Sequence, residues 1–407
     1  MITYKVGLSV EECDKFIEES PYGNLLQGSK WTKVKDNWQS RRIGFYQGDQ
    51  LVACASLLCK KIINPYKVAY IPRGPVMDYN NQELVYEVFQ ALKIFGKKEG
   101  FLLIKCDPAV LFDRSNQLQV EECQKLITTI EKTGAIWSGL TLKLSETIQP
   151  RFQANKYLTA ESIEDYQKHV RRLVKTAHKK GVEISKGHEN ELEVFSDLVA
   201  LTEKRKQIHL RNYDYFKKIK DIYKEQAQFY FATLDLEKQI RTQKERLEQL
   251  ENDLLKTPEH QKSRIRDIEQ QKAAAKKQIM ELQELVKDYP NQVIIAGVLG
   301  IQFGSGVELL YAGMDDNFRQ YYPQYLLDTE IFKSSYELGF KWANMGGVEG
   351  NLDGGLATFK TSFKPTIDEY IGEFNIPLNK TAYKLGRLTY KKYKRVKKQL
   401  TKGRIIK

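Results

Sequence analysis

The residues best suited by type and position to do chemistry are an aspartate and a lysine far apart in the sequence. Asp107 ends an apolar run, residues 101–106, that is typical of a buried strand, and α/β proteins place active groups at the carboxyl ends of such strands. Lys360 follows a glycine-rich loop, and its neighbour Phe359 has a ring that can stack on a base or a ribose. Plainer interpretations remain open: an Asx turn before Pro108 for the aspartate, and a solvated lysine beside a core phenylalanine.

Two segments carry most of the excess positive charge. The 407 residues include 65 Lys and Arg against 52 Asp and Glu, a formal net charge of +13. Residues 384–407 hold eleven Lys or Arg and no acid, and residues 168–180 hold six and no acid. These six are Lys168, Arg171, Arg172, Lys175, Lys179 and Lys180. We expect both segments to bind a polyanion, although a merely solvated helix face would also explain residues 168–180.

The remaining composition narrows the class of protein. The five cysteines form no CxxC pair, which favours reduced thiols in the core. The five histidines have no metal-ligand spacing, so we expect no metal site. There is no signal-peptide pattern, and no apolar run reaches the roughly 18 residues of a membrane helix. We therefore expect a cytoplasmic protein.

An antiparallel coiled coil is predicted within the second half of the chain. Apolar residues recur at heptad spacing in the first helix, at Leu236, Ile240, Leu247, Leu250 and Leu254. After a turn at 257–259 the pattern resumes and runs from Ile265 to Val286. Strand-like runs, 229–233 and 293–298, flank the pair of helices. Because twelve Lys and Arg balance twelve Asp and Glu over 235–288, this arm is not expected to be the main polyanion-binding surface.

Strand and helix signals alternate in both halves, which predicts an α/β fold with mixed sheets and a duplicated unit. We expect one domain over 1–155, a second over 156–233 and 290–380, the arm at 234–289, and a basic helical tail at 381–407. Acyltransferases of the GNAT type use helix-flanked mixed sheets in this order. Neither copy has the Arg/Gln-x-x-Gly-x-Gly/Ala loop that holds the pyrophosphate of acyl-CoA in that fold. We therefore expect two GNAT-like acyltransferase domains whose acyl donor is not CoA.

Further motifs are spread along the whole chain. They are Trp31-Thr-Lys-Val-Lys-Asp-Asn-Trp38, Pro72-Arg-Gly-Pro75, Asp107-Pro108, Ile208-His-Leu-Arg211, Leu310-Tyr-Ala-Gly-Met-Asp315, Gly354-Gly-Leu-Ala-Thr-Phe-Lys-Thr-Ser-Phe363 and Glu369-Tyr-Ile-Gly-Glu-Phe374. In order and spacing they resemble the FemABX family, whose members use aminoacyl-tRNA to build peptidoglycan cross-bridges. The coiled-coil arm, taken with residues 210–212 and 311–316, most resembles the MurM/MurN branch of that family.

The resemblance implies a reaction and its partners. The amine of a stem-peptide lysine would attack the ester carbonyl of an aminoacyl-tRNA that carries a small amino acid. The branch favours alanine or serine, with glycine the less favoured residue. The arm and the tail favour lipid II over UDP-MurNAc-pentapeptide as the acceptor. Because the ester is already activated, neither a covalent enzyme intermediate nor a cofactor is required, but an amine with a pKa of about 10.4 must first lose a proton.

The resemblance also assigns the catalytic roles. Asp107 would orient the amine or accept its proton. Lys360 and Phe359 would bind the tRNA terminus and stabilise the developing charge. From their charge rather than from the resemblance, the helix at 168–180 is expected to bind the tRNA, and the tail at 384–407 to hold either tRNA or the anionic inner face of the membrane.

Binding of the acceptor is implied for five residues. Lys35 and Arg211 would anchor the phosphates of the precursor, while Tyr215, Tyr311 and Arg73 would line its cleft. From the residues alone, Lys35 could equally be an exposed helix lysine, Arg211 could form a structural salt bridge, and both tyrosines could belong to the core.

Two other classes of protein remain as alternatives. One is a catalytically inactive coiled-coil scaffold on a transferase-like fold, which requires the matches at Asp107 and Lys360 to be accidental. The other is a CoA-dependent N-acyltransferase, which the absent pyrophosphate loop disfavours. Transfer of label from an aminoacyl-tRNA to a muropeptide would separate the three.

Overall fold

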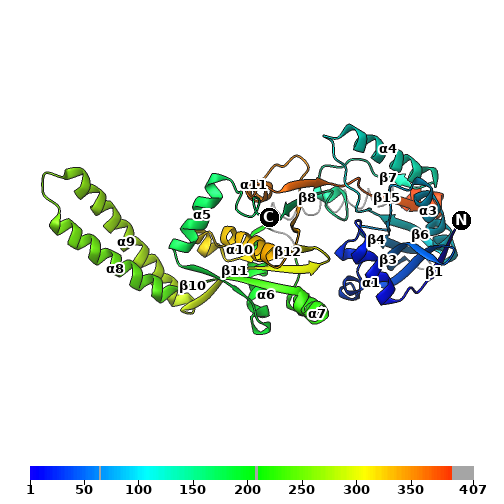
Figure 1. The fold of residues 1–407 in the computed structure, drawn as a ribbon. Helices are drawn as coiled ribbons and strands as arrows, with labels where there is room; N and C mark the ends of the chain where they lie inside the picture. The colour runs from blue at the N-terminus through cyan, green and yellow to red at the C-terminus, as the bar shows by residue number, and fades with distance from the viewer. Residues whose placement is uncertain (64–65, 207–209, 387–407) are drawn as a thin grey trace. The chain divides into compact units, whose positions relative to one another are not determined.

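The computed structural model describes residues 1–63, 66–206 and 210–386, and the chain divides into two compact units (Figure 1). The first unit comprises Met1–Asn155, Asn344–Thr361 and the residues from Pro365 onward, and the second comprises Lys156–Ala343 and Ser362–Lys364. The α/β class with mixed sheets is as expected. Most of the basic tail predicted at 381–407 lies outside the described residues.

The first unit contains a sheet of eight strands in the order β1-β2-β3-β4-β6-β15-β7, with β5 paired to β3. Only β4 and β6 are parallel among the described pairs of this sheet. The strands are β1 (Ile2–Val6), β2 (Gln39–Gln47), β3 (Gln50–Ile63), β4 (Tyr66–Ile71), β5 (Val76–Met77), β6 (Phe101–Cys106), β7 (Ile136–Trp137) and β15 (Phe374–Pro377). The boundary expected after residue 155 coincides with the start of the second unit. Residues 344–361 and 365–380, however, were expected in the second domain and belong to the first unit, where β15 inserts between β6 and β7.

Two long helices complete the core of this unit. Asn81 caps α3 by accepting a hydrogen bond from the Leu84 backbone N–H, and the apolar faces of α3 and α4 pack with the sheet residues in one hydrophobic cluster. The helices are α1 (Val10–Glu19), η1 (Leu25–Gln27), α2 (Ser29–Val34), α3 (Gln82–Lys98), α4 (Gln117–Lys132), η2 (Leu144–Glu146) and α11 (Gly355–Thr361). A further strand, β14 (Thr366–Glu369), pairs antiparallel with β8 (Phe152–Tyr157). The chain passes between the units within β8, within β13 (Trp342–Val348), and again on either side of Ser362–Lys364.

The second unit has four antiparallel strands in the order β12-β11-β10-β9. They are β9 (Val182–Lys186), β10 (Ala227–Asp235), β11 (Gln292–Phe303) and β12 (Gly306–Met314). The helices are α5 (Lys168–Lys179), η3 (Glu189–Glu191), α6 (Leu192–Lys206), α7 (Tyr213–Tyr223), η4 (Lys224–Gln226), η5 (Asp316–Tyr321) and α10 (Pro323–Glu337). Apolar residues of α5, α10 and the strands share one buried cluster.

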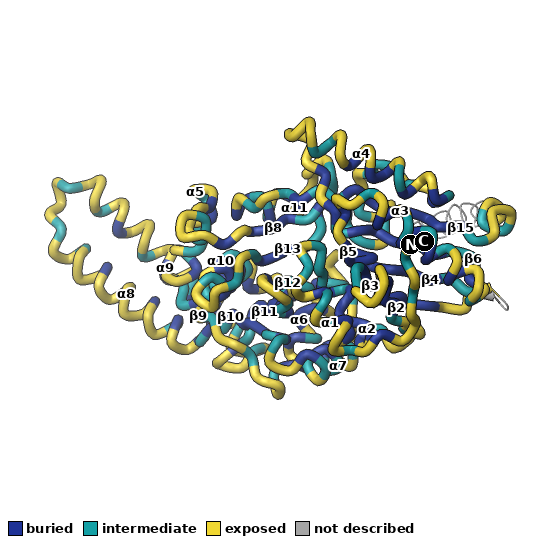
Figure 2. Tube along the Cα trace, turned by 45° about the vertical axis from the view of Figure 1, so that its right-hand side comes forward, coloured by how far each residue is buried: buried dark blue, intermediate teal, exposed yellow. Residues whose placement is uncertain are grey.

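The predicted arm is present as a hairpin of α8 (Leu236–Lys256) and α9 (Lys262–Asp288), which lie side by side (Figures 1 and 2). It replaces a β-turn, because β10 and β11 stay paired up to Asp235 and Gln292. At about 1.5 Å per residue, the 21 residues of α8 extend roughly 31 Å. The predicted seam is correct at Leu250 and Ile268, which are buried, but Val286 is 36% exposed.

All five cysteines are buried and free, in agreement with core thiols. Across the part of the chain that the structure describes, no helix combines the length and apolar character needed to cross a bilayer.

Candidate active site

Asp107 directly follows β6, beside the end of its parallel neighbour β4. The Tyr70 hydroxyl donates to its Oδ2 at 2.9 Å, and the Arg73 backbone N–H donates to its Oδ1 at 2.8 Å. The side chain is only 2% exposed. This burial raises the pKa of Asp107 to about 6, although the Arg73 guanidinium and both hydrogen bonds favour the charged form. At neutral pH the group is therefore mainly a carboxylate, and it holds the turn that follows β4.

Arg73 connects this carboxylate to residues from later in the chain. Its backbone adopts a left-handed conformation with φ of 52°, which is uncommon for a residue other than glycine. Nη2 donates to the Pro150 carbonyl at 2.6 Å, and the guanidinium carbon lies 3.9 Å from the centre of the Tyr370 ring. Arg73 is buried, so its contacts make it a support for Pro150 and Tyr370. Contact with a substrate, as predicted from the sequence, would require it to leave them.

Lys360 lies in the last turn of α11 and is also buried. Its Nζ donates to the Gly347 carbonyl at 2.9 Å. Gly347 packs so closely on Pro150 that an added Cβ would come within 2.5 Å of the proline Cβ. Asp107, Arg73, Pro150, Gly347 and Lys360 thus form one connected series within the first unit, which we call the Asp107–Lys360 series. Phe359, predicted to stack on the tRNA terminus, is half-buried on the same short helix.

A second group of predicted residues lies in the second unit. The Arg211 guanidinium carbon lies 5.0 Å from the centre of the Tyr215 ring. Tyr215 and Tyr311 meet edge to face at 5.9 Å, and Phe216 packs against Tyr311 at 5.3 Å. Arg211 itself is exposed. The sequence-predicted set Arg211, Tyr215 and Tyr311 is therefore brought together, with the cation at the surface and the rings packed behind it.

Arg211 also lines a groove of about 470 Å³ beside α6. The other lining residues are Ser196, Ala200, Glu203, Lys204, Leu210 and Asn212. Two cations, one carboxylate (Glu203), a hydroxyl and an amide line it, so its charge is net positive, which suits a polar, anionic ligand.

Lys35 lies at the end of α2, and its Nζ is 4.5 Å from the centre of the Trp31 ring. The segment before α2 is tied to the Arg73 turn, because Gln27 Nε2 donates to the Pro72 carbonyl at 2.6 Å. Lys35 is half-buried rather than fully exposed, so the structure does not match the simple picture of a solvated helix lysine.

The basic helix predicted at 168–180 is α5. Its apolar face is buried at Val170 and Ala177. Five of its six predicted cations are exposed: Lys168, Arg171, Arg172, Lys175 and Lys179. Lys180 differs, because its Nζ donates to the Gln320 carbonyl at 2.7 Å and lies 5.2 Å from the centre of the Tyr321 ring. Only the five exposed cations present a surface to a polyanion.

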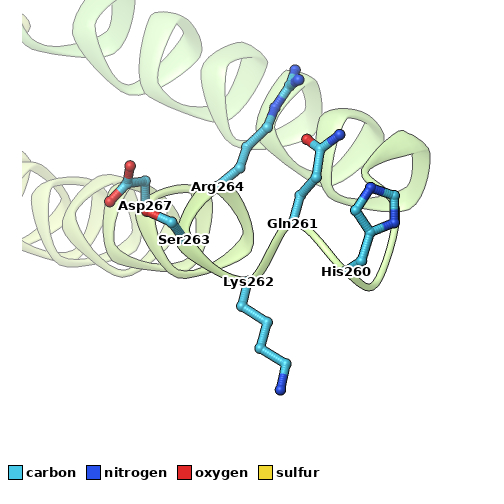
Figure 3. A pocket seen from close by; sticks show the side chains of 6 residues that line it. All are labelled: His260, Gln261, Lys262, Ser263, Arg264 and Asp267. Atoms are coloured by element: carbon cyan, nitrogen blue, oxygen red, sulfur yellow. The ribbon is translucent and has the colours of Figure 1, made fainter.

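A hollow of about 540 Å³ lies at the tip of the arm (Figure 3). It is lined by His260, Gln261, Lys262, Ser263, Arg264 and Asp267. In Figure 3, Lys262 points away from the side on which Arg264 and Gln261 lie. None of the residues assigned to chemistry lines this hollow, so we do not regard it as the reaction site.

Sequence reasoning assigned no role to three members of the site, Tyr70, Pro150 and Tyr370, although Tyr370 lies in the Glu369–Phe374 motif. Tyr70 is the penultimate residue of β4, two positions before the Pro72-Arg-Gly-Pro75 turn, and that position was a usable signal. Nothing local distinguishes Pro150, because its role depends on contacts with Arg73 and Gly347 that are distant in sequence.

Over residues 1–63, 66–206 and 210–386, no cluster of three His, Cys, Asp or Glu could hold a metal ion.

Known proteins resemble this chain over nearly its full length. The model of the FemAB family matches residues 8–391. A lipid II:glycine glycyltransferase of Staphylococcus epidermidis is 28% identical over 420 residues, which cover 98% of this chain and 97% of that protein. The Staphylococcus aureus enzyme of the same name is 28% identical over 424 residues, with the same coverage. A crystal structure of FemX aligns with a TM-score of 0.76 and 27% identity over 94% of this chain and 99% of that one.

These comparisons confirm the enzyme class, an aminoacyltransferase. They contradict the prediction that alanine or serine is preferred over glycine, because these relatives are named as glycine transferases. The arm and the 210–212 and 311–316 motifs were too weak a basis for choosing the donor. Placement in the MurM/MurN branch is not confirmed and stays a prediction. With a family match from residue 8 to residue 391, the protein belongs to the FemAB family.

Proposed function

We propose that this protein transfers glycine from glycyl-tRNA to the side-chain amine of a stem-peptide lysine in lipid II. The choice of glycine and of a lipid-linked acceptor rests on the names of the relatives, lipid II:glycine glycyltransferases, which align with 98% of this chain. The use of tRNA rests on the resemblance of the motifs. The product is the beginning or an extension of a peptidoglycan cross-bridge.

The reaction forms one C–N bond and breaks one ester C–O bond. The neutral amine attacks the glycyl carbonyl, the carbonyl oxygen becomes an oxyanion, and the tetrahedral intermediate expels the ribose oxygen of the tRNA. The amine loses a proton, and the ribose oxygen gains one. The enzyme must therefore help deprotonate an amine with a pKa of about 10.4 and stabilise a transient negative charge.

The observation that carries the proposal is the Asp107–Lys360 series. It joins a mainly ionised carboxylate to a buried lysine through Arg73, Pro150 and Gly347. A cation held away from water stabilises an oxyanion more strongly than one in solution, which supports Lys360 as the group that stabilises charge. Asp107 has both oxygens engaged by Tyr70 and Arg73, so its contribution is to orient the site and, through its carboxylate, to favour loss of the proton.

Arg211 and the α6 groove supply the second half of the proposal. An exposed guanidinium backed by Tyr215 and Tyr311 is suited to a phosphate, which it can meet with two parallel hydrogen bonds. Lipid II carries a pyrophosphate, so this group is proposed to bind the acceptor. The exposed cations of α5 are proposed to bind the tRNA backbone.

The test uses the full chain with tRNA charged separately with radiolabelled glycine, alanine or serine. Each donor is offered with lipid II and, in parallel, with UDP-MurNAc-pentapeptide. We expect transfer from glycyl-tRNA to lipid II to be the fastest of the six combinations. Absence of transfer from glycyl-tRNA to either acceptor, with folded protein, would overturn the proposal.

A further inference from the structure

The acceptor that holds Lys360 belongs to a pair of glycines at the end of β13. Gly346 has a φ of 83°, a conformation that glycine adopts readily and other residues rarely do. Gly347 provides the carbonyl that accepts from Lys360 Nζ. The peptide unit between Gly346 and Gly347 is flanked by two glycines, which gives it more freedom to rotate than any other. The Gly347 carbonyl belongs to the next peptide unit, so its direction depends on a separate constraint on this segment.

Asn344 supplies such a constraint from two residues upstream. Its Oδ1 accepts a hydrogen bond from the Gly346 backbone N–H at 2.7 Å, which closes an Asx turn. Its Nδ2 donates to Gln153 Oε1 on β8 at 2.9 Å. Asn344 is only 4% exposed, and buried side-chain amides with both ends bonded are rigid. The turn is thereby anchored to a neighbouring strand.

Contacts on the far side of Gly347 complete the constraint. An added Cβ at this residue would lie 2.5 Å from Pro150 Cβ and 2.9 Å from Leu144 Cδ2. The glycine therefore sits directly against these side chains and has no space in which to move toward them. Asn344 on one side and Pro150 on the other thus hold the backbone that carries the Gly347 carbonyl, which accepts from Lys360.

We propose that Asn344 is a positioning residue for the transfer reaction, acting through the Gly346–Gly347 pair to orient the Lys360 ammonium. The inference rests on the proposed function, in which Lys360 stabilises the oxyanion. An ammonium on a four-carbon stem has many rotamers and three equivalent donors. Fixing one of those donors on the Gly347 carbonyl reduces the directions that the other two can take. Asn344 thus affects the rate of transfer without touching a substrate.

Loss of this constraint has a recognisable kinetic signature. Asn344→Ala leaves the charge of Lys360 in place but frees the glycine pair, so kcat should fall while KM for both substrates stays within about twofold. A displacement of about 1 Å in a catalytic group can lower a rate by about 100-fold, and we expect a loss of roughly 10- to 100-fold. Asn344→Asp keeps an oxygen that accepts from the Gly346 N–H, so it should retain most of the wild-type kcat.

A double-mutant cycle with Lys360→Ala separates positioning from general damage. If Asn344 acts through Lys360, Asn344→Ala should cause no further loss of kcat in the Lys360→Ala background. The matched control is Asn375→Ala, which removes another buried asparagine of the same unit, whose Nδ2 donates to Ser138 Oγ at 3.0 Å. We expect Asn375→Ala to reduce kcat by the same factor, or not at all, in both backgrounds.

The experiment measures kcat and KM for glycyl-tRNA and lipid II in each variant, with circular dichroism as the test of folding. Should Asn344→Ala fail to fold, Gln153→Ala replaces it, because it removes only the bond that anchors the turn to β8 and should give a smaller loss of the same kind. A folded Asn344→Ala with kcat within twofold of wild type would overturn the inference, as would an equal loss in both backgrounds. Wild-type protein without any transfer would instead refute the proposed function.

Discussion

Adding a methyl group at Gly347 tests the Asp107–Lys360 series at its most tightly packed contact. Gly347→Ala would place a Cβ at 2.5 Å from Pro150 Cβ, whereas ordinary contacts begin at 3.4 Å. Relief of this overlap requires a displacement of about 0.9 Å, shared between Gly347 and Pro150. Because the Gly347 carbonyl accepts from Lys360 and the Pro150 carbonyl accepts from Arg73, either movement disturbs the site.

The size of both effects can be worked from that displacement. Overpacking of a dense region typically costs about 1–3 kcal/mol of stability, and a shift of about 1 Å in a catalytic group lowers a rate by about 100-fold, or about 2.7 kcal/mol in the barrier. The assay is single-turnover transfer from glycyl-tRNA to lipid II, with denaturant unfolding on the same samples.

Gly355→Ala is the matched control. No atom lies within 4 Å of a Cβ at Gly355, its φ is not positive, and it begins α11, the helix that carries Lys360. The substitution should therefore leave the rate unchanged and raise stability by about 0.4–1 kcal/mol. A Gly347→Ala variant that transfers glycine as fast as Gly355→Ala would refute the reasoning.

Three further predictions concern other parts of the proposed site. The pKa of Asp107 rises from 3.8 to about 6 on folding. Between these two pH values the native state therefore holds a proton that the unfolded state has lost. Relative to Asp107→Asn, the wild type should lose up to about 3 kcal/mol of stability as the pH rises through this window. Denaturant unfolding near pH 4 and near pH 7 measures this, and a constant difference between the two proteins would contradict it. Arg211→Ala should raise KM for lipid II by about 10-fold with little change in kcat. Arg211→Lys should restore only part of the affinity, because lysine cannot reproduce the planar contact with Tyr215. An unchanged KM in steady-state kinetics would exclude Arg211 from the acceptor site. The double variant Arg171→Ala with Arg172→Ala should weaken binding of glycyl-tRNA and reduce the dependence of that binding on salt concentration. The matched double variant Lys262→Ala with Arg264→Ala, at the tip of the arm, should do neither. Equal effects of the two in filter binding would argue against α5 as the tRNA surface.

Local pattern was sufficient for some of the elements that carry candidate residues, although not for α11, which carries Phe359 and Lys360. The apolar run 101–106 coincides with β6, so the placement of Asp107 at its carboxyl end follows from sequence alone. The heptads likewise located α8 and α9, because a seam is a property of spacing within one segment. The seam fails at its base, where Gln239 and Gln243 are buried and Val286 is 36% exposed. There, α8 and α9 pack against the rest of the second unit as well as against each other, as the burial of Leu236 and Leu282 in its core shows.

Contacts between distant segments set the limit of what the sequence reveals. Residues 374–377 were expected in the second domain, but they form β15 between β6 and β7, and no local signal specifies a pairing across about 270 residues. Pro150 and Asn344 could not be identified for the same reason. Nothing in the sequence around them is distinctive, and their roles come from contacts with Arg73, Gly347 and Gln153. Arg73 was predicted to line the acceptor cleft, but it is buried and its contacts lie within the protein, with Pro150 and Tyr370.

The central claim is glycine transfer that depends on Lys360, and analysis of the reaction product tests it most directly. Lipid II incubated with glycyl-tRNA and the wild-type protein should yield a stem peptide with glycine amide-linked to the lysine side chain, identified by tandem mass spectrometry. Lys360→Ala, folded by circular dichroism, should yield far less of this product under the same conditions. Unmodified lipid II with the wild type, or an equal yield from Lys360→Ala, would contradict the account.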